Sequence, residues 1–288
     1  MPLLRYPGSK DKLYDGALKP LFPSWVTSRL FSSGKAIGYY EPFFGCGAIG
    51  FRVMHELPRS CSVWINDKDA DLICLWRAVM NEKRPLMRLV WQFVPTAERF
   101  FEFKEQDGIA EGSDAERGFR KLALHRMSVS GFGVKSGGPI GGRDQSNKQY
   151  TVGCRWNPES IKRDIERLSG LLHSFRDVRI TCGDFENVLD SAGKGVFVYA
   201  DPPYYVKGSQ LYKHAMTEGD HERLAAAAQR CKGDWVVSYD DCERVRSLYS
   251  WASVHELEVR YSNAVCTGTH RPKNKELAII PSVYLNGT

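Results

Sequence analysis

Apolar segments that run into turn-forming residues are the first pattern visible along the chain. They span 36–47, 61–69 and 195–204, and they end in glycines, in a cluster of acids and in two prolines, respectively. Apolar residues at the spacing of one helix face follow the first two segments, over 48–57 and 69–81. This alternation of strand and helix predicts a parallel sheet covered by helices.

The alternation stops after about residue 82, where helical patterns follow one another without a strand. Segments 84–106 and 114–131 have helical spacing, and the glycine-rich segment 131–150 is typical of a long loop or a hairpin. A further helix is predicted over 157–175, because Asn157 can cap it and a proline occupies its first position.

Strand-like segments resume at 178–185 and 234–239. We therefore expect an α/β protein in which residues 1–82 and 168–288 form the sheet domain. Residues 83–167 are expected to form an inserted, mainly helical subdomain.

Composition narrows the protein class. An apolar content of 42% and a charged content of 26% over 288 residues are ordinary for a soluble globular protein. The eight cysteines contain no C-x-x-C pair, which indicates reduced thiols instead of a disulfide framework or a metal site. No signal peptide and no apolar run of membrane-spanning length is evident, so we expect a cytoplasmic protein that does not enter a membrane.

Positive charge is concentrated in the expected insert. The formal net charge is +6, yet residues 117–167 hold eleven Lys or Arg against four Asp or Glu, a local net charge of +7. Such a block suits a phosphate-rich partner, and a solvated surface explains it equally well.

A glycine turn follows the first strand in the stretch EPFFGCG, residues 41–47. Gly45 and Gly47 allow a ligand to approach the backbone, and the next helix offers free N–H groups. The turn is not G-x-G-x-x-G, so it does not specify a dinucleotide pyrophosphate. Tight turns of α/β proteins also carry such glycines for structural reasons alone.

Acidic residues end the second strand. Asp67 lies 22 residues beyond Gly45, where an acid can hold both hydroxyls of a ribose. A helix-capping role is the alternative for Asp67. Asp69 and Asp71 are expected to be capping and first-turn acids.

The stretch DPPY, residues 201–204, carries the chemistry. An acid at the end of a buried strand is costly unless something uses it, and Pro202 and Pro203 fix the backbone beyond it. Asp201 and the Pro202 carbonyl can both accept hydrogen bonds from one exocyclic amino group, while Tyr204 offers a ring on which a planar base can stack. Acceptors of this kind stabilise positive charge developing on such a nitrogen as it takes up a methyl group. A plain turn capped by Asp201 is the structural alternative.

Taken together, these segments resemble the DNA adenine-N6 methyltransferases of the Dam type, the D12 class, which use S-adenosylmethionine. The resemblance is carried, in order, by RYPGSK (5–10), EPFFGCG (41–47), NDKDADLI (66–73), CGDF (182–185), DPPY (201–204), VVSYDD (236–241) and KEL (275–277). The order is that of the family's alpha group and implies a Rossmann-like methyltransferase sheet with helices on both faces, plus an inserted DNA-recognition subdomain.

The resemblance also implies roles for individual residues. Catalysis would rest on Asp201, Pro202, Pro203 and Tyr204, with Asp201 touching the target amine. Lys10 would meet the methionine carboxylate of the cofactor or order the DPPY loop, and both options stay open. The implied cofactor contacts are Tyr6, Lys10, Glu41, Phe43, Gly45, Gly47, Asp67, Asp184, Phe185 and Asp201.

The insert would bind duplex DNA while the target adenine is flipped out, because N6 cannot be reached in line within the base stack. Segment 131–142 would enter a groove and place Lys135 or Arg143 against a guanine. This segment lacks the arginine–aromatic–asparagine pattern of the GATC-reading members, so no target sequence is assigned. The phosphate contacts are expected among Arg117, Arg120, Lys121, Arg126, Lys135, Arg143, Lys148 and Arg155.

Other readings of the same features remain open. An N4-cytosine or an RNA adenine methyltransferase would use a similar tetrapeptide. A non-catalytic nucleic-acid-binding protein could keep the same scaffold, and a nicotinamide dehydrogenase would lack its glycine fingerprint here. We expect a monomer or weak dimer, with a cognate restriction nuclease as a further candidate partner.

Overall fold

A seven-stranded mixed sheet forms the centre of the chain. The computed structural model describes residues 3–4, 10, 14–23, 38–129, 131, 133–206, 208, 213–259 and 274–282. The strands are β1 (Gly38–Glu41), β2 (Ser62–Asp67), β3 (Asp177–Cys182), β4 (Val196–Ala200), β5 (Asp234–Asp240), β6 (Ser253–Val259) and β7 (Asn274–Ile280). Their order is β3-β2-β1-β4-β5-β7-β6, and β7 is antiparallel to both of its neighbours.

The central strands are buried on both faces, which explains their unbroken apolar runs. In β4, Val196, Val198 and Ala200 belong to one hydrophobic core, while Phe197 and Tyr199 belong to the other. The prediction of an α/β sheet covered on both faces is confirmed.

Helices form the outer layers. Residues of α8 (Phe185–Asp190), α10 (Glu218–Arg230) and α11 (Glu243–Leu248) pack in one of these cores. Residues of α2 (Gly50–Glu56), α3 (Ala70–Asn81) and α7 (Pro158–His173) pack in the other. Among the helices that the structure describes, none is long and apolar enough to cross a membrane.

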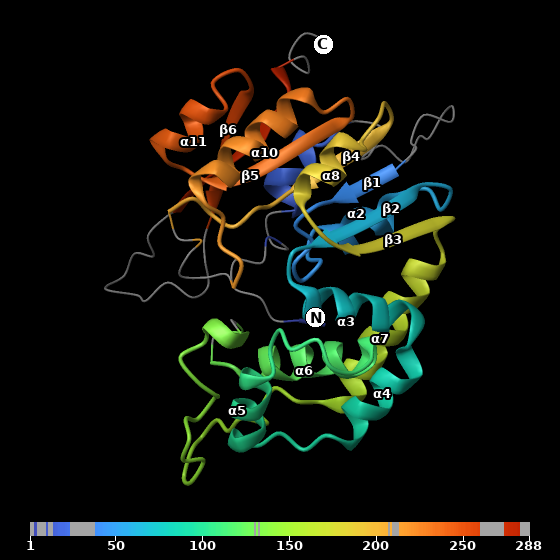
Figure 1. Ribbon diagram of the computed structural model, residues 1–288, viewed down its shortest axis with the longest axis vertical. Coiled ribbons are helices and arrows are strands. Elements are labelled where there is room, and N and C mark those ends of the chain that lie inside the picture. Colours follow the sequence, from blue (N-terminus) through green and yellow to red (C-terminus); the bar gives the residue numbers. More distant parts are fainter. Residues whose placement is uncertain are drawn as a thin grey trace.

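The expected insert is mainly helical. It contains α4 (Lys83–Gln92), α5 (Ala97–Glu105) and α6 (Asp114–Met127), and these helices lie with α3 and α7 as a separate layer below the sheet (Figure 1). Thr96 caps α5, Ser113 and Glu116 form a capping box on α6, and Asn157 caps α7 as predicted.

The glycine-rich segment after α6 is a loop, with little hairpin pairing. Within its described residues it holds one isolated bridge, between Ser128 and Pro139, and the 3-10 turn η4 (Gly133–Lys135). Two further short helices precede the sheet, η2 (Tyr14–Leu18) and η3 (Lys19–Leu21).

The helical layer and the sheet domain share a single core. One predicted boundary, at 82/83, coincides with the junction of α3 and α4, but the other, at 167/168, falls inside α7. Helix α6 packs closely on α3 at Gly118, which has no Cβ. An added Cβ at this position would lie 2.4 Å from the Leu75 Cα. The chain therefore passes between the two parts within a continuous helix, and their functional division stays a prediction.

Candidate active site and family

Acidic residues converge at one edge of the sheet. Because parallel strands end on the same side, Glu41, Asp67 and Asp240 at the ends of β1, β2 and β5 lie at the edge where Asp201 follows β4. A cavity opens there, and among its lining residues are these members of the predicted cofactor set: Lys10, Glu41, Phe43, Gly45, Asp67, Asp184, Phe185 and Asp201. Gly47 is not among the residues that line this cavity, and Tyr6 lies outside the described residues.

Asp201 is held from one side. Lys10 Nζ donates to its Oδ1, and Ser238 Oγ donates to the same oxygen at 2.9 Å. The Asp201 side chain keeps 25% of its surface exposed. Among the described residues both contacts go to Oδ1, so Oδ2 is left to accept a hydrogen bond from a ligand.

Lys10 contacts the DPPY segment, as one of the two predicted roles requires, and its role toward the cofactor stays a prediction. Its ammonium also lies 3.1 Å from Ser238 Oγ, 3.5 Å from Glu276 Oε2 and 4.9 Å from the centre of the Tyr204 ring. Burial alone would lower the pKa of Lys10, but Asp201, Tyr204 and Glu276 outweigh it and raise the pKa well above its usual value. Lys10 therefore stays charged inside the protein.

Tyr204 is tied to β7. Its hydroxyl donates to Glu276 Oε1 at 2.6 Å, and only 9% of the residue is exposed. The chain beyond it is fixed by Asp240, whose carboxylate accepts from the backbone N–H groups of Tyr205 and Val206 at 2.9 Å each. The Tyr204 ring is therefore largely covered in this structure, and its predicted stacking with a base stays a prediction.

Asp67 closes the glycine turn. One carboxylate oxygen accepts from Gly45 N at 2.8 Å and the other from Asp69 N at 2.9 Å. Burial raises its pKa to about 6. The cap of α3 is Asp69, which accepts from the N–H groups of Asp71 and Leu72. The capping alternative for Asp67 is therefore excluded, and the expectation for Asp69 is confirmed.

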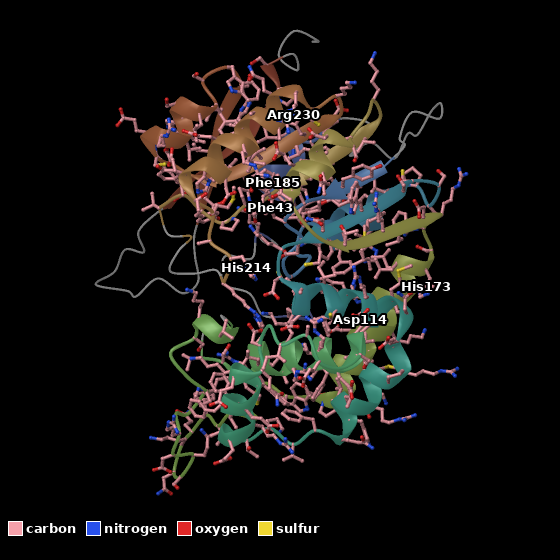
Figure 2. All side chains as sticks on the ribbon, in the orientation of Figure 1. Phe43, Asp114, His173, Phe185, His214 and Arg230 are labelled. Atoms are coloured by element: carbon pink, nitrogen blue, oxygen red, sulfur yellow. The ribbon has the colours of Figure 1, made fainter. Side chains whose placement is uncertain are left out.

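Aromatic rings form another part of the cavity wall. Phe43 and Phe185 stack with ring centres 5.4 Å apart, and Figure 2 shows them close together above His214. Asp184 caps α8 by accepting from Glu186 N at 2.9 Å. His214 lies below the two rings, between the sheet and the helical layer (Figure 2).

Glu41 is buried under the glycine turn. Tyr39 donates to its Oε2 at 2.6 Å, and burial raises the pKa of Glu41 well above its usual value. A Cβ at Gly50, the first residue of α2, would lie 2.3 Å from the same oxygen, so a side chain there would force the Glu41 carboxylate to move.

The predicted DNA contacts fall into three groups by exposure, and the least exposed group corrects part of the prediction. Lys121 is 3% exposed and pairs with Asp69 and Asp107, and Arg117 pairs with Asp71 at 2.7 Å. These side chains hold α6 against α3, so we remove both from the phosphate-binding set.

Arg126 is also removed from the set of predicted phosphate-binding residues. It is 6% exposed, and its Nε and Nη2 donate to the Leu3 carbonyl at 3.1 and 2.8 Å. Arg155 donates to the carbonyls of Ser128 and Val129, and Arg120 to that of Glu111. Both are partly exposed.

The exposed members of the predicted set all belong to the loop after α6. They are Lys135, Arg143 and Lys148, and the Arg143 guanidinium lies 4.0 Å from the centre of the Phe101 ring.

Sequence reasoning missed several residues of the site. Ser238, Glu276 and Asp240 fix the DPPY segment, and the segment 213–216 lines the cavity. A signal for Glu276 existed, because an acid directly before the apolar run 277–280 is as costly to bury as Asp201.

Comparison with known proteins agrees with this geometry. A statistical description of the D12 class N6 adenine-specific DNA methyltransferases matches residues 6–263. The type II methyltransferase M1.LlaDCHI of Lactococcus lactis subsp. cremoris is 28% identical over 263 residues, which is 86% of this chain and 87% of that protein. The DNA N-6-adenine-methyltransferase of Escherichia phage P1 is 26% identical over 247 residues, 81% of this chain and 29% of the phage protein. The chain belongs to the D12 class of N6 adenine-specific DNA methyltransferases.

Proposed function

We propose that this chain transfers a methyl group from S-adenosylmethionine to N6 of an adenine flipped out of duplex DNA. The observation that carries the proposal is the state of Asp201. Lys10 and Ser238 hold one carboxylate oxygen, and the other is left to accept a hydrogen bond at the cavity. A carboxylate fixed in this way can grip one amino group in a defined direction.

The cavity fits S-adenosylmethionine in charge and in donor set. Six acidic residues and three lysines line it, which favours a cationic sulfonium. Asp67 has lone pairs left for ribose hydroxyls, since within the described part of the chain each of its oxygens accepts one backbone hydrogen bond. Phe43 and Phe185 offer apolar surface for an adenine. The cofactor, when bound, supplies an electrophilic methyl group.

The chain's own residues would then orient the target amine. Asp201 Oδ2 and the Pro202 carbonyl accept its hydrogens, which localises the nitrogen lone pair toward the methyl group. Lys10 keeps Asp201 in place, and Glu276 keeps Tyr204 in place through the hydroxyl contact at 2.6 Å. The ring of Tyr204 supports the base once it has entered.

DNA would be held by the loop after α6. Its exposed Lys135, Arg143 and Lys148 supply phosphate contacts, which offset the few kcal/mol that base flipping costs. The names of relatives as type II methyltransferases support a role beside a restriction nuclease.

Transfer of a labelled methyl group to duplex DNA and to RNA, followed by nucleoside analysis, tests the proposal. We expect N6-methyladenine in DNA alone, and label only in cytosine or in RNA would overturn the assignment. Asp201→Ala should abolish transfer and keep DNA affinity within about tenfold, because phosphate contacts dominate binding. Asp190→Ala, which removes a solvent-exposed acid of α8 outside the cavity, should transfer at the wild-type rate.

A further inference from the structure

An arginine of α10 reaches around the cavity wall without lining it. Arg223 Nη2 donates to Asp184 at 2.9 Å, Nε donates to Glu186 at 2.8 Å, and Nη1 donates to Asp220 at 3.0 Å. Its guanidinium carbon lies 5.1 Å from the centre of the Phe185 ring. Three of these four partners, Asp184, Phe185 and Asp220, line the cavity.

The contacts fix the direction of the Asp184 carboxylate. Both Arg223 Nη2 and the N–H of Glu186 donate to Oδ1, so among the described residues Oδ2 has no hydrogen-bond donor. A carboxylate turned in this way can accept from an exocyclic amine beside the Phe185 ring. Asp201, which also lines the cavity, is held in the same manner by donors to one of its two oxygens.

Arg223 is itself anchored to the start of α10 through Asp220. Asp220 takes part in the capping box of α10, where it accepts from Thr217 N at 3.0 Å. The arginine thus joins the first turn of α10 to the first turn of α8. Its planar fork of donors can serve three carboxylates and one ring at once, which the single ammonium of a lysine cannot do.

We propose that Arg223 is a positioning residue for the adenine of the cofactor, and that it acts by holding the Asp184 carboxylate and the Phe185 ring. This proposal rests on the proposed function, which supplies the identity of the ligand. Asp184 Oδ2 then accepts from the amino group of that adenine. Arg223 confers selectivity for an adenosyl group over one whose purine carries a carbonyl at the same place.

A matched control lies on the same helix. Arg230 is 44% exposed in its side chain and Arg223 is 42% exposed, and both make several ion pairs. The partners of Arg230 are Glu186 and Asp190, neither of which lines the cavity. Arg230→Gln therefore removes equivalent surface contacts without touching the adenine wall.

The test is calorimetric titration of the full chain with S-adenosylhomocysteine and with S-inosylhomocysteine, in which a carbonyl replaces the adenine amine. Wild type should bind the adenosyl ligand more tightly. Arg223→Gln should raise its Kd about fivefold, and should bring the two Kd values closer together. The Kd of Arg223→Lys for the adenosyl ligand should lie between those of wild type and Arg223→Gln, and the Kd of Arg230→Gln should equal that of wild type.

Several outcomes would overturn the inference. An unchanged Kd in Arg223→Gln would do so, as would equal weakening of both ligands, since that is what a merely structural role produces. Should Arg223→Gln fail to fold, the comparison of Arg223→Lys with Arg230→Gln decides in the same way. Absence of binding to wild type would instead remove the proposed function, and the inference with it.

Discussion

Replacing Lys121 by methionine should destabilise the fold and leave DNA binding intact. The ammonium lies 2.6 Å from Asp69 Oδ2 and 3.0 Å from Asp107 Oδ1, and the lysine and Asp107 side chains are each 3% exposed. Burial alone would lower the pKa of Lys121, but the two carboxylates outweigh it and raise the pKa. Methionine keeps the apolar stem and removes only the charge.

The size of the effect follows from the two carboxylates left behind. Breaking a buried pair by removing one partner costs about 3–5 kcal/mol. At roughly 2–4 °C per kcal/mol for a chain of this size class, Tm should fall by about 6–20 °C. Lys213 still pairs with Asp107 in the variant, so the lower half of that range is expected.

Thermal unfolding and DNA titration at several salt concentrations check this expectation, with Lys148→Met as the matched control. Lys148 is exposed on the loop after α6, so its loss should change stability by less than about 0.5 kcal/mol. It should lower the slope of log affinity against log salt by about 0.9 if it contacts a phosphate. If Lys121→Met had the Tm of wild type and a smaller slope of log DNA affinity against log salt, the assignment of Lys121 to the protein interior would be refuted.

Further outcomes are expected around the cavity. The affinity for S-adenosylmethionine should fall as pH drops through about 6, because Asp67 is charged above that pKa and loses its charge below it; titration from pH 5 to 8 should show this step, and Asp67→Asn should lack it. Ser238→Ala should lower kcat about tenfold with little change in the KM for the cofactor, since it removes one donor from Asp201; steady-state kinetics with unchanged kcat would contradict that role. Lys213→Gln should raise the cofactor Kd about threefold in calorimetry, because it releases the cavity-lining segment 213–216 from Asp107; an unchanged Kd would show that this ion pair does not hold the segment.

The central strands and the DPPY site were predictable because their signals are local. Strands β1, β2, β4 and β5 are apolar runs that end in turn residues, and each has an acidic residue of the candidate site at or just beyond its end. Strands β6 and β7 escaped prediction. The sequence of β6, SVHELEV at the edge of the sheet, has apolar residues only at 254, 257 and 259, so it shows neither an unbroken apolar run nor a regular alternation.

Side-chain contacts between segments that are far apart in the sequence could not be predicted from local sequence pattern. Ser238 and Glu276 reach the DPPY segment because β5 lies next to β4 in the sheet and β7 lies next to β5. Counting charge in the insert also could not separate Lys121, which faces α3, from Lys148, which faces solvent. Charge density predicts a basic surface and does not say which side chains form it.

The close contact of α6 with α3 limits how this enzyme can be re-engineered. Gly118 lies against the backbone at Leu75, and α7 continues from one part of the chain into the other. A graft of residues 83–167 from a relative would therefore bring a foreign helix surface against α3 and begin a mismatched junction in the middle of α7. If the predicted DNA contacts hold, redirecting the enzyme to a new target sequence is better attempted at Lys135, Arg143 and Lys148, whose side chains are exposed and lie outside that shared interior.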